Sequence, residues 1–521
     1  MKIKNSSIDD SFNGNNRNIK NYKIAVIGGG PAGIMAAISA AKMLSRSNAS
    51  SSSNSSSSSS SRNNKKINPK SKIKTKKNNE FHEVVLIEKN EALGKKLLLT
   101  GGGRCNITNN SDLKTHINAF GKNSSFLKPS LYNFDNKSLL TFFKDKGLDF
   151  KVESYEKVYP VDDKSSSVLK VLEEYLQDYN VRLLLGYKVS NIEKNDDYFD
   201  ISMERYLKLQ KTPPSEFQNR PNNNNNNNNN NNRENSSIKV LKVILATGGL
   251  SYPSTGSTGD GMKFAQNHGH KLTKMNPGLT PLKVQEEWIK DLSGIKFENI
   301  GLSFRKSSKK RVSYMGTILF THFGLSGPGI LDLSQEISLL TNSHINLQNF
   351  SKNKEKNNEA KIGLNNFPME LFLDLIPQIS IDELKDKFNL EFSQKGKTII
   401  KNYLKSILPN KFIIPFLIHS NIDHNIQLSK ISKKEKNRLI ANLKDLKIHI
   451  TGLMPFKSAM ITCGGVYHKN IDSKTMESKL VRGMYFAGEI IEFCGLSGGY
   501  NLQMAFSTGY TAGKSSVTSI I

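Results

Sequence analysis

The chain has 521 residues, a formal net charge of +28 at pH 7 and a sequence pI of about 9.7. This length predicts more than one domain, and no stretch approaches the ~18 consecutive apolar residues of a membrane-spanning helix, so no membrane partner is expected. The charge raises the question of nucleic-acid binding. Many of the lysines fall in low-complexity sequence or are spread along the chain, so no nucleic acid is expected as the main partner.

Two inserts are too polar to bury a core. Residues 45–79 are mostly serine, asparagine and lysine, and residues 211–237 contain an unbroken run of asparagine from 222 to 232. Such segments cannot offset the entropy lost on ordering, so we expect both to be disordered. Residues 1–21 are also expected to be disordered, and they lack the apolar stretch of a signal peptide. We therefore expect a cytoplasmic protein.

The first predicted elements form a dinucleotide-binding turn. Residues 22–27, "YKIAVI", predict a buried strand, and "GGGPAG" and "IMAAISAAKML" predict a glycine turn and a helix. In a G-x-G-x-x-G turn the second glycine lets a pyrophosphate approach the backbone, and the third lets the helix pack on the strand. The helix N-terminus then faces the phosphates. The candidate cofactor-binding residues are Gly28, Gly30, Pro31, Ala32 and Gly33.

An acid after the next strand tests this motif, because it would bind the ribose hydroxyls. Past the serine-rich insert, residues 83–87, "EVVLI", predict a strand that is followed by Glu88. Glu88 and the adjacent Lys89 are therefore candidates, and an ordinary surface acid is the alternative for Glu88. An acid here disfavours a 2′-phosphate, so the site fits FAD or NAD.

A second glycine cluster favours FAD over NAD. The stretch "TGGGRCNITN" would let the backbone pass beside the pyrophosphate and the flavin, and its arginine would offset phosphate charge. A flexible surface turn is the alternative. The cysteine would be a redox partner of the flavin or, in the plainer interpretation, a small buried residue. The candidates are Gly101, Gly102, Arg104, Cys105 and Asn106.

The middle of the chain returns to the cofactor and then changes pattern. A strand at 240–245 leads into Thr247, Gly248 and Gly249, a turn that would contact the cofactor or merely reverse the chain. From residue 278 the pattern is one of short strands, and about 380–446 it becomes lysine-rich and helical. His322 is a candidate general acid, with a structural histidine as the alternative. No His, Cys or Asp cluster has the spacing of a metal site.

The last glycine-rich segment predicts a second cofactor contact. A strand at 480–486 is followed by an acid, a glycine turn and a helix lined with small residues. The amides at that helix N-terminus would face the flavin N1–C2=O and stabilise the reduced anion. A purely structural turn is the alternative, but it does not explain the order of these elements. The candidates are Gly488, Glu489, Gly498, Gly499, Tyr500 and Asn501.

Together these motifs resemble the BaiN/RdsA-like family of NAD(P)/FAD-dependent oxidoreductases. The resemblance rests on "GGGPAGIMAA", "EKNEALGKKLLLTGGGRCNITN", "ATGGLSYPSTGSTGDGMKFA", "GTILFTHFGLSGPGILDLS" and "GLSGGYNLQMAFSTGYTAG". It implies an α/β protein with a two-dinucleotide-binding-type, Rossmann-like FAD domain, interrupted by a β-rich insert domain with a small helical lobe. The predicted boundaries are 22–277 and 451–521 for the FAD domain and 278–450 for the insert.

The expected function is that of an FAD-dependent oxidoreductase with non-covalent FAD. NAD(P)H is the expected donor and a small organic molecule the acceptor, possible acceptors including an enone-type double bond, since the resemblance implies such a reaction for some members. No second G-x-G-x-x-G turn after a strand is visible, so either NAD(P)H would meet the flavin directly or the donor is another molecule. A tRNA-modifying flavoprotein and an FAD-binding redox-sensing module without turnover are the alternatives.

Overall fold

The computed structural model describes residues 20–53, 82–121, 123–205, 235–307, 310–340 and 369–520. The chain forms two compact units. Unit 1 comprises Met1–Gly249, Thr255–Thr273 and Gly465–Ile521, and unit 2 comprises Leu250–Ser254 and Lys274–Gly464. Within the described ranges, no helix is both long enough and apolar enough to cross a membrane.

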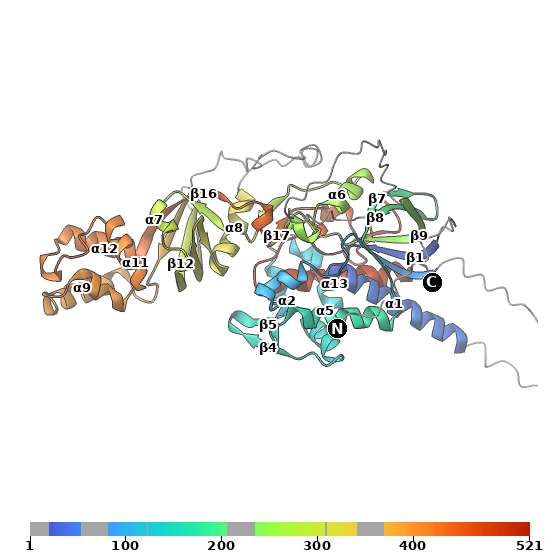
Figure 1. Ribbon diagram of the computed structural model, residues 1–521, viewed down its shortest axis with the longest axis horizontal. Helices are drawn as coiled ribbons and strands as arrows, with labels where there is room; N and C mark the ends of the chain where they lie inside the picture. The colour runs from blue at the N-terminus through green and yellow to red at the C-terminus, as the bar shows by residue number, and fades with distance from the viewer. Residues whose placement is uncertain are drawn as a thin grey trace, which may run out of the picture. The chain divides into compact units, whose positions relative to one another are not determined.

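A mostly parallel sheet forms the centre of unit 1 (Figure 1). Its strands are β1 Lys20–Ile27, β2 His82–Glu88, β6 Arg182–Leu185, β7 Tyr187–Lys194, β8 Phe199–Arg205, β9 Asn235–Leu245 and β18 Met484–Phe486. The order is β6-β2-β1-β9-β8-β7, with β18 also paired to β9. β1 lies parallel to both β2 and β9, and β18 is parallel to β9. The turns that follow these four strands therefore share one edge of the sheet.

Two long helices of unit 1 pack against each other, although they lie at opposite ends of the chain. They are α1 Pro31–Ser53 and α13 Tyr500–Thr518, side by side in Figure 1. A Cβ added at Gly509 would lie 2.3 Å from the Ala32 carbonyl oxygen, and one at Gly513 would lie 2.2 Å from that of Ala36. The small residues of α13 thus allow backbone-to-backbone contact. α1 extends to Ser53, into the segment predicted to be disordered, and the rest of that segment up to residue 79 lies outside the described residues.

The remaining elements of unit 1 surround the sheet. A small sheet, β3-β5-β4, lies beside the helices that follow it. The elements are η2 Leu97–Gly103, β3 Thr108–Asn109, α2 Leu113–Asn118, α3 Lys128–Asn133, α4 Asn136–Lys144, β4 Phe150–Glu153, β5 Lys157–Pro160, α5 Ser165–Asp178 and α6 Asp260–Asn267. Most of the second predicted insert, 211–237, lies outside the described residues, and β9 begins within its last residues.

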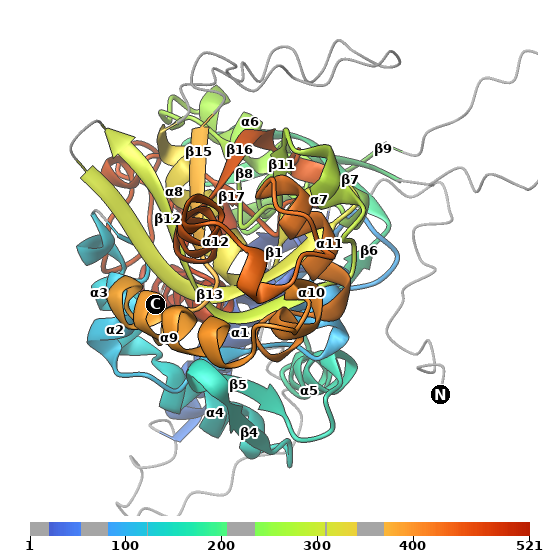
Figure 2. The same ribbon diagram turned by 90° about the vertical axis from the view of Figure 1, so that its left-hand side faces the viewer.

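Unit 2 consists of a closed barrel and a helical lobe. The barrel strands are β11 Leu282–Val284, β12 Lys296–Ser307, β13 Lys310–Thr321, β14 Gly324–Ser326, β15 Met369–Asp374 and β16 Leu446–Leu453. The lobe helices are α9 Ile381–Gln394, α10 Ile400–Tyr403, α11 Asn410–His419 and α12 Lys433–Asp445. Figure 2 shows these helices beside the long β12–β13 pair. One apolar core, which includes Phe304, Phe320 and Phe412, serves both parts.

Unit 2 also contains smaller elements. β10 Asn276–Gly278 pairs with β17 Ile461–Cys463 in a separate two-stranded sheet, and α7 Glu287–Lys290 and α8 Pro328–Leu340 pack against the barrel.

Candidate functional site

The glycine turn after β1 leaves one position open. The Gly28 amide donates to the Ile87 carbonyl oxygen at 2.9 Å, which ties the turn to β2. A Cβ at Gly28 would lie 2.5 Å from the Ala246 oxygen, and one at Gly33 would lie 1.9 Å from the Gly28 oxygen. A Cβ at Gly30, in contrast, would have no neighbour within 4 Å. The turn therefore packs closely against β9 and α1 and leaves room at Gly30, where a pyrophosphate would approach.

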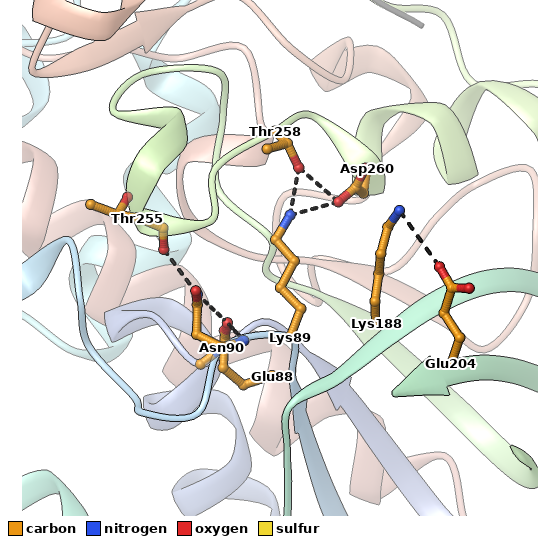
Figure 3. A network of polar contacts seen from close by, with 9 residues as sticks. Glu88, Lys89, Asn90, Lys188, Glu204, Thr255, Thr258 and Asp260 are labelled. Carbon is orange, nitrogen blue, oxygen red and sulfur yellow. Dashed lines mark hydrogen bonds and ion pairs between the residues drawn. The ribbon is translucent and has the colours of Figure 1, made fainter. Parts of the chain in front are cut away.

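Glu88 lies against this turn at the end of β2. One carboxylate oxygen accepts a hydrogen bond from the Gly29 amide at 2.7 Å. The other accepts from the Asn90 amide at 2.8 Å and from its side chain at 2.6 Å (Figure 3). The acid is thus held beside the turn, and its binding of the ribose hydroxyls remains a prediction.

Lys89 points into a polar network of its own. Its amine donates to the Thr258 hydroxyl and lies 2.7 Å from the Asp260 carboxylate (Figure 3). Burial opposes the ionisation of Asp260, but attraction to Lys89 and the hydrogen bonds from Lys89 and Thr258 hold its pKa below the usual value. The charge of Lys89 is therefore already balanced within the protein, and its contact with the cofactor remains a prediction.

The second glycine cluster is an open loop. Gly101, Gly102 and Gly103 have φ angles of 58°, 68° and 92°, and a Cβ at either of the last two would have no neighbour within 4 Å. Arg104 donates to Glu153 and to Asp163, and these hydrogen bonds raise its pKa. Its guanidinium is thus balanced by two carboxylates, so its predicted contact with phosphate also remains a prediction.

Cys105 is fully buried, and its thiol is free. Burial raises its pKa to about 12. At neutral pH the side chain is therefore a neutral thiol and not a thiolate, which favours its interpretation as a small buried residue.

The start of the C-terminal segment meets the N-terminal turn. A Cβ at Gly488 would lie 2.7 Å from the Ala32 Cβ, and the Gly488 amide donates to the Thr508 hydroxyl at 2.9 Å. Glu489 forms an ion pair with Lys96 at 2.6 Å. The fold thus brings Gly488 to the first turn of α1, the helix that begins directly after the G-x-G-x-x-G glycines.

The glycine turn before α13 is held by side chains. Gly499 is the N-cap of α13 with φ 101°, and a Cβ there would lie 2.3 Å from the Thr108 oxygen. The Asn109 side chain donates to the Gly498 oxygen at 3.1 Å. Asn501 accepts from the Gly495 amide at 2.7 Å and donates to its oxygen at 2.8 Å. Asn501 thus stabilises the turn, and any contact it makes with the cofactor remains a prediction.

Two residues at this turn, Asn109 and His116, were not among the candidates predicted from the sequence. The His116 ring nitrogen Nε2 lies 2.9 Å from the Asn109 oxygen, and its ring packs edge-on against Tyr500 at 5.1 Å. Burial lowers the pKa of His116. Asn109 ends the "GGGRCNITN" motif, which was the available signal, whereas nothing near His116 in the sequence pointed to it.

Two buried polar atoms support the fit of a cofactor. Buried side-chain polar atoms without a hydrogen-bond partner occur at several places among the described residues, and two of them, the Asn106 side-chain oxygen and the Thr247 hydroxyl, belong to predicted cofactor-binding residues. Asn106 follows the glycine cluster at 101–103, and Thr247 follows the end of β9. Since buried polar atoms are normally paired, a polar ligand at these positions would satisfy them. Together with the open position at Gly30, they fit FAD.

The other two candidate positions are a closely packed turn and an exposed histidine. Gly248 has φ 72°, and a Cβ there would lie 3.1 Å from the Ser257 hydroxyl, so the turn with Gly249 is closely packed. His322 belongs to unit 2 and lies in the exposed turn between β13 and β14, where its ring contacts Phe323 at 4.8 Å. Its role as a general acid remains a prediction.

The parallel sheet, the glycine turn and the acid at the end of β2 define a Rossmann-type dinucleotide-binding protein. The family model described as "HI0933-like protein Rossmann domain" matches residues 73–213 and 208–515, and the chain belongs to this family. This membership confirms the resemblance to the BaiN/RdsA-like flavoprotein oxidoreductases.

Similar proteins carry two different names. The chain is 26% identical over 493 residues to a 3-dehydro-bile acid delta(4,6)-reductase of Clostridium scindens. The aligned region covers 94% of this chain and 98% of that protein. It is also 26% identical over 434 residues to a ribosomal RNA dihydrouridine synthase of Haemophilus influenzae, covering 83% of this chain and 92% of that protein.

The solved structures that match the chain are more distant in sequence. FrdA of the E. coli quinol fumarate reductase matches 96% of this chain and 70% of its own, with 13% identity and a TM-score of 0.43. A 3-ketosteroid delta1-dehydrogenase of Sterolibacterium denitrificans matches 96% of this chain and 100% of its own, with 10% identity and a TM-score of 0.43. At these values the likeness carries no argument about function.

Proposed function

We propose that the chain is an FAD-dependent reductase that saturates a carbon–carbon double bond conjugated to a carbonyl, with NAD(P)H as the donor. The main observation behind the proposal is the close approach of Gly488 to Ala32 in unit 1. This approach places the C-terminal glycine segment beside the N-terminal G-x-G-x-x-G turn, so both could bind one FAD. When bound, FAD supplies two-electron chemistry between a hydride donor and an electron-poor double bond.

The names of the two relatives support this reaction class. A 3-dehydro steroid with Δ4 and Δ6 double bonds is a conjugated dienone, and the double bond that is saturated in dihydrouridine adjoins a carbonyl of the uracil ring. Both reactions therefore add a hydride and a proton across a double bond activated by a carbonyl. We carry this shared chemistry over to the present chain and leave two acceptor classes: a small enone and a uridine in RNA.

The chain's own residues would bind the cofactor and position it. The glycine turn at Gly30 and the N-terminus of α1 would hold the pyrophosphate through backbone amides. Glu88 would accept hydrogen bonds from the ribose hydroxyls. The N-terminus of α13, fixed at Gly499 and Tyr500, would direct its positive end at the pyrimidine edge of the flavin and favour the reduced state.

The test is a spectrum of the purified protein, followed anaerobically as NADH and then NADPH are added. Flavin absorbance that bleaches promptly, and that returns when a small enone or a uridine-containing RNA is added, would support the proposal. A protein that cannot be reconstituted with FAD would refute the cofactor assignment. Flavin that persists with both nucleotides would refute the proposed donor while leaving FAD binding intact.

A further inference from the structure

The helical lobe of unit 2 carries an uneven charge. Between Phe392 and Lys434 the sequence contains one acid, Asp423. Besides Lys405 and Lys411, the same stretch contains exposed lysines in two groups, before α10 and around the start of α12. We define the lysine surface as Lys395, Lys397, Lys430, Lys433 and Lys434.

Backbone pairing brings the two groups together. The Ser429 amide donates to the Gly396 oxygen at 3.1 Å. Lys395 and Lys397 flank Gly396, and Lys430 follows Ser429, so three exposed lysines extend from one pair of bonded segments. Lysines that are distant in the sequence therefore share one edge of the lobe.

The start of α12 continues this edge. Ser432 is the N-cap of α12, so Lys433 is its first residue. One turn further on, the amine of Lys436 donates to the Asn389 side chain of α9 at 2.9 Å and lies 5.6 Å from the centre of the Phe392 ring. The first turn of α12 thus lies along the end of α9, from which the chain continues to Gly396.

Most of this charge is not balanced by the protein. Lys395 lies 3.4 Å from Glu391 in an exposed pair. Within the described part of the chain, the other four members of the lysine surface have no ion pair. The acid that follows Lys434 in the sequence, Glu435, accepts hydrogen bonds from the amide and hydroxyl of Ser432 and so caps the helix.

A comparison of two helices in the same lobe shows that helix stability does not explain these lysines. α9 and α12 both begin with a capping box, at Ser380 and Ser432. α9 follows the rule for a helix N-terminus, with Asp382 and Glu383 in its first turn. α12 keeps the capping-box acid, Glu435, but has Lys433 and Lys434 before it, where α9 has Ile381 and Asp382, and the positive end of the helix dipole repels these two lysines. Local rules that are broken without a local gain occur mainly at functional sites.

We propose that the lysine surface binds the phosphate backbone of a structured RNA. Lysines on flexible stems contact phosphates as point charges and position a nucleic acid without reading its sequence. A membrane surface would add exposed apolar side chains among the lysines. Of the exposed large apolar residues, Leu390 lies next to Asn389 on α9, and none falls in segments 395–401 or 426–436, which carry the lysines. The inference rests on the proposed reductase function and selects, from its two acceptor classes, a uridine in RNA.

The experiment measures binding of the full-length holoprotein to a fluorescein-labelled RNA hairpin with uridines in its loop, across a series of salt concentrations. The test variant is Lys433→Glu/Lys434→Glu. The matched control is Lys137→Glu/Lys144→Glu on α4, where two exposed lysines give the same change in net charge. We expect the test variant to weaken binding at least ~10-fold and to reduce the slope of log K against log salt by about 2, because each lost phosphate contact lowers the slope by about 1.

Stability separates a binding role from a structural one. The test variant places acids at the N-terminus of α12, so its thermal unfolding temperature should be equal to or above that of the wild type while its RNA affinity falls. The control should bind within about twofold of the wild type.

Wild-type protein that does not bind the hairpin, or a test variant that binds as the wild type does, would overturn the proposal. So would phosphatidylserine vesicles that bind the wild type while the hairpin does not. NAD(P)H-driven bleaching of the flavin, measured in parallel, tests the reductase function separately.

Discussion

Gly30 and Gly33 belong to the same turn, but an added methyl group would meet different surroundings at each. At Gly30 it would meet nothing within 4 Å, whereas at Gly33 it would lie 1.9 Å from the Gly28 oxygen. We expect Gly30→Ala to leave the apo protein as stable as before, or about 0.4–1 kcal/mol more stable, and to lose at least ~10-fold in FAD affinity. Gly33→Ala should lose about 1–3 kcal/mol of apo stability. Urea unfolding and FAD titration separate the two, and a Gly30→Ala protein with unchanged affinity would contradict the pyrophosphate assignment.

Glu88 accepts hydrogen bonds at both carboxylate oxygens from protein groups that can only donate there, namely the Gly29 amide and the two nitrogens of Asn90. In Glu88→Gln the new amide would turn N–H groups towards one of these donors. We expect about 1–3 kcal/mol of lost stability together with weaker FAD binding. Glu83→Gln, on the same strand as Glu88, is the control, because it breaks the partly exposed ion pair with Lys23 of β1 and should cost about 0–1 kcal/mol. Equal effects of the two variants would count against a special role for Glu88.

The contact between α1 and α13 is decided at the scale of the element. Alanine has a higher helix propensity than glycine by about 1 kcal/mol, which alone would favour Gly509→Ala. The new Cβ would lie 2.3 Å from the Ala32 oxygen, however, and the backbone of one helix would have to move. We expect the clash to dominate, with a net loss of about 1–2 kcal/mol and a weaker FAD site, measured by urea unfolding. Lys514→Ala, at an exposed position of the same helix, should change stability by less than about 0.5 kcal/mol.

Buried histidines make stability depend on pH. His270 follows α6, and its ring nitrogen Nδ1 lies 2.9 Å from the Ala265 oxygen while Nε2 lies 2.7 Å from the Ser478 hydroxyl. Burial lowers the pKa of His270 from its usual value of 6.5. The unfolded chain therefore binds a proton at this site at a higher pH than the folded chain does, and stability falls as pH drops below about 6.5. We expect His270→Gln to be less stable than the wild type at about pH 7.5 but to lose less on acidification to about pH 5.5. Parallel losses in the two proteins would show that His270 does not contribute.

At the scale of the molecule, the two ends of the insertion of unit 2 are adjacent within unit 1. The Thr273 amide donates to the Gly465 oxygen at 2.8 Å, and the Gly465 amide donates to the Thr273 hydroxyl at 3.1 Å. We expect a protein in which a short glycine–serine linker replaces residues 274–464 to fold and bind FAD, because unit 1 has its own sheet and core. Its absorbance spectrum and thermal unfolding test this. A colourless protein that unfolds without cooperativity would show that unit 1 depends on unit 2.

Sequence patterns predicted the local parts of the site well. The strand, glycine turn and helix at 22–44 appear as β1 and α1, and the turn before α13 lies at Gly499 as expected. These features depend on backbone needs that neighbouring residues reveal, such as positive φ and the absence of a Cβ. Helix ends were less predictable. α1 continues to Ser53 through serine-rich sequence, because the apolar face of its first turns had already fixed the helix on the sheet.

The sequence by itself determined the family, the dinucleotide-type turn and the residues whose backbone shape the site requires. Only the tertiary structure decided how side chains pair across long distances. It pairs Lys89 with Asp260, and it pairs Arg104 with Glu153 and Asp163. It also brings His116 and Asn109 to the turn before α13. It also brought the lysines of the lobe to one edge through the pairing of Ser429 with Gly396. The physical reason is that a turn depends on its own few residues, whereas a charge pairs with any group that the fold brings near it.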